Sequence, residues 1–459
     1  MSIAAPLRSH GPESPRVAVI GAGLLGLTAA YRLAQAGMNV TVYERDAQLG
    51  GLAGTTPLDG IPIDRFYHVT LPTDERVIEL AEELGLGDRF RFRRSGVGFY
   101  HQGRLASMST PSELLRFPGL SAVDRMRLVA FVARCQVGSD YSKLEETPIE
   151  DWLVRLCGRR TWEVLWRPLL DSKFDGRYQD LPATYLWARS RRMSGSRDKS
   201  SQEMMGSLDG GYQTLVDALG VAIEQLGGTV LRKTPVKAVV SSAGRAVGTL
   251  STRGYEAHDQ VISTLLPVAT EPLLGRDLAA AVGQDGHRYL GIVCLVMRLR
   301  RSLSPWYTLN ITDRRIPLTG VIETTHVVDP ERVGGTLVYA PKYVNPDSPE
   351  LGRSNVEIKE AYMGHVRTMF PGFSPQDDVL ASQVARARVA EPVHTLGGEG
   401  RLPDMFPAPG LAMASSAHVY PEIVNGQAAI GVAERLVEGL LPRLTEATSE
   451  LPIATRRAS

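Results

Sequence analysis

One glycine-rich turn near the start of the chain constrains its fold more than any other feature. Residues 16–20 (RVAVI) are a short, apolar, β-branched run that is typical of a buried parallel strand. The turn 21–26 (GAGLLG) follows, and the alanine-rich stretch 27–36 after it predicts a helix. A second strand-like run, 39–43 (NVTVY), ends at Glu44. In this β-α-β order, the spacing Gly-x-Gly-x-x-Gly predicts a dinucleotide-binding turn.

Each glycine of the turn has a physical reason. Gly21 permits the tight turn, Gly23 lets a pyrophosphate approach the backbone, and Gly26 lets the helix pack closely on the strand. The first N–H groups of the helix and its positive dipole end would then point at the phosphates. Glu44 is placed to accept hydrogen bonds from the adenosine ribose, and its charge would repel the 2′-phosphate of NADP. The predicted cofactor-binding residues of this unit are Gly21, Gly23, Leu24, Leu25, Gly26, Glu44 and Arg45. A purely structural glycine turn is the alternative.

A glycine pair lies just beyond the predicted ribose carboxylate, in the segment 44–54 (ERDAQLGGLAG). An NAD domain has no need of such a pair. The segment resembles that of two-dinucleotide-binding-domain flavoproteins, in which the pair lets the chain pass close to the FAD diphosphate. The resemblance implies FAD as the cofactor, with Gly50, Gly51 and Leu52 beside it; a plain glycine loop is the alternative. No cysteine follows Cys294, which excludes a cysteinyl link to the C-terminal segment, so we expect non-covalent FAD.

The remaining sequence predicts a discontinuous arrangement of two domains. We expect an α/β fold: a Rossmann-like, two-dinucleotide-binding FAD domain with a discontinuous α+β substrate domain. The FAD-binding domain is expected over 16–105, 205–266 and 389–442, and the substrate domain over 106–204 and 267–388. The first part of the substrate domain has a helical pattern and the second is rich in strand-like runs. Flexible tails are expected at 1–15 and 443–459. The inserts contain no second Gly-x-Gly-x-x-Gly, so no NAD(P)H domain is expected.

As a whole, the chain resembles the superfamily of FAD-dependent amine oxidases, protoporphyrinogen oxidases and phytoene desaturases. The resemblance is strongest over 16–68, 205–240 and 405–440. The runs 63–68 (IDRFYH) and 166–174 (WRPLLDSKF) are similar to segments of bacterial protoporphyrinogen-oxidase-like proteins. The resemblance to the superfamily implies an oxidoreductase in which the backbone of Val236 contacts the adenine. The alternative is that Val236 is an ordinary valine of a strand.

The C-terminal segment is expected to reach the flavin. A strand, a loop and a helix that begins near Asn425 would aim backbone N–H groups at the flavin pyrimidine. The residues expected there are Val424, Asn425 and Gln427. Most of the superfamily has an acidic residue before this helix, whereas this chain has Ser415 and Ser416, whose hydroxyls are expected to bind the ribityl chain or the pyrophosphate.

Four residues are candidates for catalysis. His68 follows a predicted strand at a place where, by resemblance to the superfamily, the chain is expected to pass close to the flavin, and its ordinary pKa suits a general base at neutral pH. Tyr67 and Tyr420 are expected to wall the substrate pocket. Several amine oxidases use a lysine that holds a water near flavin N5, and among the seven lysines only Lys342 has a plausible position in the insert. Each of the four has a structural alternative, such as a buried histidine or a surface lysine.

Composition limits the partners. Formal net charge is +1, so no strong field attracts the chain to nucleic acid. Three dispersed cysteines and no long apolar run predict a cytoplasmic protein with no metal site and no integral membrane segment. We expect a small-molecule substrate that gives a hydride to flavin N5, with oxygen or another electron acceptor. The alternative is a flavin-dependent isomerase that resembles UDP-galactopyranose mutase and has no net redox. The oligomeric state is left open.

Overall fold

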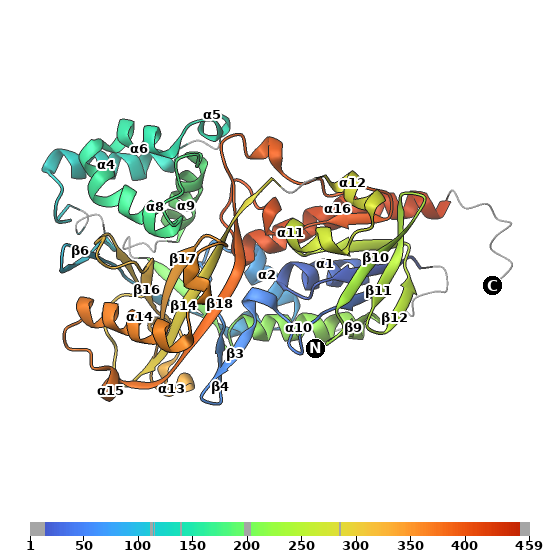
Figure 1. Cartoon of the computed structure of the whole chain (residues 1–459), viewed down its shortest axis with the longest axis horizontal. Helices are drawn as coiled ribbons and strands as arrows, with labels where there is room; N and C mark the ends of the chain where they lie inside the picture. The colour runs from blue at the N-terminus through green and yellow to red at the C-terminus, as the bar shows by residue number, and fades with distance from the viewer. Residues whose placement is uncertain are drawn as a thin grey trace.

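The computed structural model describes residues 14–110, 113, 115–137, 140–196, 203–283 and 286–449. Figure 1 shows three regions: a region on the right that contains the predicted dinucleotide-binding turn, called here the nucleotide-binding region, a large twisted sheet at the lower left, and a lobe of helices above that sheet. None of the helices within the described ranges is long and apolar enough to cross a membrane.

A parallel five-stranded sheet is the core of the nucleotide-binding region. Its order is β19-β13-β1-β2-β9, so three distant parts of the chain contribute strands. The strands are β1 (Arg16–Ile20), β2 (Asn39–Tyr43), β9 (Thr229–Leu231), β13 (Gln260–Ser263) and β19 (Leu411–Met413). Helices α1 (Leu24–Gln35), α10 (Tyr212–Gln225) and α16 (Gly426–Ser449) pack together with α2 (Glu75–Glu83) on one hydrophobic core. This layering brings the starts of α1 and α16 to the carboxyl edge of the sheet, where doubly wound folds bind ligands.

Three smaller antiparallel sheets lie within the described residues, in addition to the parallel sheet and the large sheet. Strands β10 (Val236–Ser242), β11 (Arg245–Ser251) and β12 (Gly254–Ala257) form an antiparallel meander, beside the helices α11 (Pro267–Thr270) and α12 (Arg276–Val282). Two antiparallel strand pairs complete the set: the hairpin of β3 (Thr55–Leu58) with β4 (Ile61–Asp64), and the long-range pair of β5 (Phe90–Arg94) with β8 (Met204–Leu208).

The large sheet has seven strands in the order β18-β14-β17-β16-β15-β6-β7. They are β6 (Val97–His101), β7 (Arg104–Ser107), β14 (Arg288–Leu299), β15 (Thr308–Ile311), β16 (Gly320–Glu323), β17 (Thr336–Val344) and β18 (Val379–Val393). Helix α14 (Asn355–Met369) covers one face, near the short helix α15 (Pro375–Asp378) (Figure 1). The short helix α13 (Pro330–Val333) belongs to the opposite face, where Val333 is part of the apolar core. This opposite face also packs against β3 and β4. Alternate residues of one strand therefore lie on opposite faces of the sheet. This alternation determines on which face Lys342, the predicted catalytic lysine, lies.

The helical lobe has its own apolar core. Its elements are α4 (Ala122–Cys135), α5 (Ser142–Glu145), α6 (Ile149–Cys157), α7 (Arg159–Thr161), a π-helical turn (Trp162–Trp166), α8 (Arg167–Lys173) and α9 (Thr184–Gly195). Trp162 is fully buried in this core and Trp166 packs against it.

The mixed α/β architecture agrees with the predicted fold class, but several boundaries differ. Strands β6 and β7 hydrogen-bond into the large sheet, so the predicted domain boundary at 105 lies inside that sheet. Strand β18 passes the boundary predicted at 388 and ends at Val393. Helix α16 continues to Ser449 because Leu440 and Leu444 extend its buried face, so the C-terminal tail expected from 443 begins as helix. Residues 450–459 and 1–13 of the expected tails lie outside the described residues.

A buried ion pair ties the helical lobe to the nucleotide-binding region. Arg192 of α9 donates to both carboxylate oxygens of Asp74, at 3.2 and 2.7 Å, and the Asp74 side chain is only 3% exposed. Arg192→Met leaves the buried Asp74 carboxylate without its charged partner, which lowers the free energy of unfolding by about 3 kcal/mol. We therefore expect a fall of several degrees in the thermal midpoint. The control is Arg177→Met, whose partner Asp347 is 73% exposed and which should leave the midpoint nearly unchanged. Equal effects of the two variants would contradict this account of the interface.

Candidate functional site

The turn between β1 and α1 has the geometry that the sequence predicts. Gly21 has φ +101°, a conformation that favours glycine. A Cβ on Gly26 would lie 2.1 Å from the Gly21 carbonyl oxygen, so this glycine allows the helix to pack on the turn. A Cβ on Gly23 would meet no heavy atom within 4 Å, so open space lies beside the backbone at the helix start. Leu24 and Leu25 begin α1 with buried side chains, and first-turn N–H groups have no partner within a helix. This cradle fits a diphosphate.

Glu44 lies at the end of β2, 8% exposed, beside this cradle. One carboxylate oxygen accepts from the Ala22 N–H and the other from the Asp46 N–H, both at 2.9 Å. These bonds fix the carboxylate and leave it lone pairs for the hydroxyls of a ribose. The next residue, Arg45, is exposed. Val236 opens β10 and is half-buried, close in sequence to Thr234, whose N–H donates to the Glu44 carbonyl oxygen at 2.7 Å.

The glycine pair lies directly against the first turn. The Gly50 N–H donates to the Ala22 carbonyl oxygen at 2.8 Å, and Gly50 forms a parallel bridge with Gly23. Gly50 and Gly51 have φ of +113° and +57°, and a Cβ on Gly50 would lie 2.9 Å from the Gly54 Cα. Leu52 is 41% exposed. The sharp bend therefore needs glycine, and it keeps the loop beside the diphosphate cradle.

The C-terminal candidates divide into two groups. Ser415 is buried and its hydroxyl accepts from the Ala417 N–H at 3.2 Å, while Ser416 is half-buried. Asn425 accepts from the Ala428 N–H at 2.9 Å and thereby caps α16. Gln427, in contrast, accepts from the Arg76 N–H at 2.8 Å, so its side chain is directed to the start of α2. Val424 lines a pocket, so the loop before α16 forms part of the wall of that pocket.

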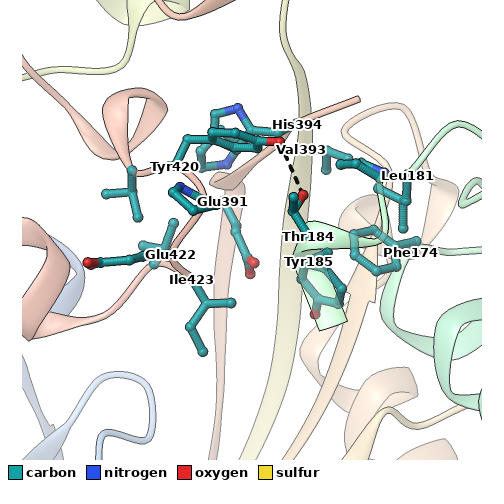
Figure 2. A pocket seen from close by; sticks show the side chains of 15 residues that line it. Phe174, Leu181, Thr184, Tyr185, Glu391, Val393, His394, Tyr420, Glu422 and Ile423 are labelled. Atoms are coloured by element: carbon teal, nitrogen blue, oxygen red, sulfur yellow. Dashed lines mark hydrogen bonds between the residues drawn. The ribbon is translucent and has the colours of Figure 1, made fainter. Parts of the chain in front are cut away.

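We call this pocket the Tyr420 pocket. Helices α8 and α9, the end of β18 and the loop 419–424 enclose it (Figure 2). The Tyr420 hydroxyl lies 3.1 Å from the Thr184 hydroxyl, and burial raises the Tyr420 pKa to about 12. Tyr420 is therefore neutral. Aromatic and polar side chains share the lining, which includes Phe174, Thr184, Tyr185, Glu391, His394, Tyr420 and Glu422.

His68 lies elsewhere, in a second pocket that we call the Asp64 pocket. Its ring is 5.2 Å from that of Tyr212, centroid to centroid. Burial lowers the His68 pKa to about 4, so the imidazole is neutral at pH 7, and it raises the Asp64 pKa to about 7. Tyr212 also limits the residue at the start of α16, because a Cβ on Gly426 would lie 2.6 Å from the Tyr212 hydroxyl oxygen.

The lowered pKa of His68 gives a pH-dependent prediction. Between pH 6.5 and 4 the unfolded chain binds a proton that folded His68 does not, so stability falls as the pH falls through this window. At pH 5 this amounts to roughly 2 kcal/mol. We expect His68→Gln to lose less thermal stability than the parent between pH 7 and pH 5. His326→Gln should lose more, because Glu323 raises the His326 pKa. Parallel melting curves for all three proteins would contradict the neutral state of His68.

Lys342, the lysine predicted to act in catalysis, and Lys173 lie on opposite faces of the large sheet. Lys342 points to the α14 face of the large sheet, where its Nζ lies 3.3 Å from a Glu350 carboxylate oxygen, so it does not join the pockets. Lys173, at the end of α8, lies on the other side and pairs with Glu391 of the Tyr420 pocket. Its Nζ is also 3.3 Å from the centroid of the Tyr343 ring. The Tyr67 and Tyr343 hydroxyls are 3.3 Å apart, so Tyr67 belongs to this cluster.

Sequence reasoning missed Lys173, Glu391, Asp64 and Tyr212. For Lys173, a signal was present: it is one of seven lysines in a chain with 51 basic residues, and it lies in the run 166–174. Nothing in the sequence indicated Glu391, because its partner is 218 positions away.

Comparison with known proteins identifies the family of the chain. The model of the family described as flavin containing amine oxidoreductase matches residues 26–434. Protoporphyrinogen oxidase 2 of Arabidopsis thaliana is 39% identical over 77 residues, which span 17% of this chain and only 15% of that relative. The 15-cis-phytoene desaturase of Synechococcus elongatus is 24% identical over 396 residues, 78% of this chain and 80% of the relative.

Solved structures share the fold. A putative protoporphyrinogen oxidase from Exiguobacterium superposes with a TM-score of 0.71 at 19% identity, over 94% of this chain and 99% of the other. A reduced UDP-galactopyranose mutase superposes with a TM-score of 0.70 at 15% identity, over 94% and 96% of the two chains. The family match confirms the resemblance seen in the sequence and FAD as the cofactor. This chain belongs to the family of flavin-containing amine oxidoreductases.

Proposed function

We propose that the protein removes a hydride from a C–N or C–C unit of a small organic substrate held in the Tyr420 pocket. One observation carries this proposal. The loop 419–424 that walls the pocket runs directly into the N-terminus of α16, one of the two helix starts at the nucleotide-binding edge. Bound FAD supplies the acceptor for the hydride, at flavin N5.

The residues of the chain would divide the remaining work. The diphosphate would lie at Gly23 and the start of α1, with the adenosine ribose at Glu44. The N–H groups at the start of α16 would stabilise negative charge on the pyrimidine end of the ring. Phe174, Tyr185 and Tyr420 would enclose an apolar part of the substrate, and Glu391 and Thr184 would orient its polar part. Because His68 is neutral, it can accept a proton, but it lines the other pocket, so we assign it no role in this step.

Anaerobic mixing tests the proposal. Substrate candidates are added to the oxidised holoprotein without oxygen, and the visible flavin absorption is followed. Loss of the flavin absorption supports hydride removal from the substrate. Its return when oxygen or an artificial acceptor is admitted identifies the acceptor that reoxidises the flavin. Turnover without bleaching, seen only after reduction with dithionite, would instead indicate the isomerase chemistry of a mutase.

A further inference from the structure

Glu391 lines the Tyr420 pocket and forms an ion pair with Lys173, which lies behind it. The Lys173 Nζ lies 2.5 Å from a Glu391 carboxylate oxygen, and the two side chains are 16% and 19% exposed. Two charges removed from water are tolerated when each neutralises the other. The pair joins α8 of the helical lobe to β18 of the large sheet, so the geometry of the pocket depends on it.

The surroundings keep the lysine charged. Burial by itself lowers the pKa of Lys173, but Glu391, Tyr185 and Tyr67 raise it, and the net pKa lies above that of an ordinary lysine. The ammonium also rests on the face of the Tyr343 ring, where a cation is attracted by the aromatic electrons. A compact ammonium suits this place between a ring and a carboxylate, whereas a planar guanidinium needs more room.

The other titratable groups of the pocket add no buried charge. Burial lowers the pKa of His394 to about 4, so it is neutral, and Tyr420 is neutral as well. Glu422 is exposed at the pocket, where water and salt screen its charge. The buried wall therefore offers hydrogen-bonding groups, chiefly the Glu391 carboxylate, without an unbalanced negative charge. A buried ammonium would find no counter-charge there.

We infer that the Tyr420 pocket selects a substrate whose polar group is uncharged and donates a hydrogen bond to Glu391, and that Lys173 sets this selectivity by neutralising the carboxylate. Glu391 is the recognition residue and Lys173 is a positioning residue. The inference rests on the proposed function in one respect, that the Tyr420 pocket is the substrate pocket.

Two probes of equal shape test this selectivity on the holoprotein. Benzyl alcohol and benzylammonium differ only in the head group, and their dissociation constants are measured by calorimetry at about pH 8, where a carboxylate is ionised. The parent protein should bind the alcohol at least fivefold more tightly. In Lys173→Met the carboxylate loses its partner, so benzylammonium should bind at least tenfold more tightly than to the parent, and the preference should reverse.

The chain offers a matched control on the other face of the same sheet. Lys342 and Glu350 form a Lys–Glu pair of similar burial, with side chains 20% and 11% exposed. Lys342→Met should leave both dissociation constants within twofold. The double variant Lys173→Met with Glu391→Gln should gain no affinity for benzylammonium. Should Lys173→Met fail to fold, Glu391→Gln gives the opposite readout: it leaves the lysine unpaired and should weaken benzylammonium at least fivefold.

Several results would overturn the inference. They are equal affinity of the parent for both probes, an unchanged preference in Lys173→Met, an equal shift in Lys342→Met, and no binding of either probe. None of these decides whether a substrate bleaches the flavin, so the proposed function stands or fails separately.

Discussion

Gly26→Ala should give a protein that neither folds normally nor retains FAD. Its new methyl group would lie 2.1 Å from the Gly21 carbonyl oxygen and 2.7 Å from the Thr264 hydroxyl oxygen, and backbone cannot move aside cheaply. The start of α1 would have to shift away from β1. We expect little recovered protein, a lower thermal midpoint and no visible flavin absorption.

Gly23→Ala separates the fold from cofactor binding. Its φ and ψ of −72° and 172° suit alanine, and the added methyl group would meet no atom of the chain within 4 Å. The cofactor-free protein should therefore keep its thermal midpoint, while FAD affinity falls at least about 100-fold because the methyl group occupies the place of the diphosphate. Gly364→Ala, in an open position of α14, is the control: it should leave FAD affinity unchanged and, because alanine favours a helix interior over glycine, should not lower the thermal midpoint. Normal FAD content in Gly23→Ala would contradict the proposed place of the diphosphate.

Glu44→Ala should also weaken FAD binding strongly. The variant loses the carboxylate expected to bind the ribose, and it leaves the N–H groups of Ala22 and Asp46 without their acceptor. Charge-assisted hydrogen bonds of this kind contribute about 1.5–3 kcal/mol, so FAD should dissociate on the order of 100-fold more readily. Titration of the cofactor-free protein with FAD measures the change.

An exposed acid of the same region supplies the control for Glu44. Glu224 of α10 points to solvent, and Glu224→Gln should change FAD affinity by less than twofold. If Glu44→Ala bound FAD as tightly as the parent, the carboxylate would have no part in the site.

The strands and the glycine turn of the nucleotide-binding region could be predicted from the sequence because their interactions are local. Gly21, Gly23, Gly26 and Glu44 lie within 24 consecutive positions, and the strand–turn–helix geometry fixes their relative places. The predicted strands 16–20 and 39–43 agree with β1 and β2 residue for residue. Helix α1 begins three residues before the predicted start. Leu24 and Leu25, which the sequence assigns to the glycine-rich loop, already lie in the first turn of the helix.

The arrangement of the Tyr420 pocket could not be predicted from the sequence, because its contacts join segments that are far apart in the chain. Lys173 meets Glu391 across 218 positions, and only the pairing of β17 with β14 decides that Tyr343 faces the pocket side while Lys342 faces α14. A one-residue change of register would exchange the two side chains. For the same reason the sequence could not show that β6 leaves the nucleotide-binding region and joins β15.

A crystal structure of the holoprotein with FAD tests the central claim most directly. The account predicts the diphosphate against Gly23 and the first N–H groups of α1, the ribose on Glu44, and the flavin ring at the start of α16 beside the Tyr420 pocket. FAD bound with its diphosphate away from Gly23, or with its ring walled off from Tyr420 and Glu391, would contradict it.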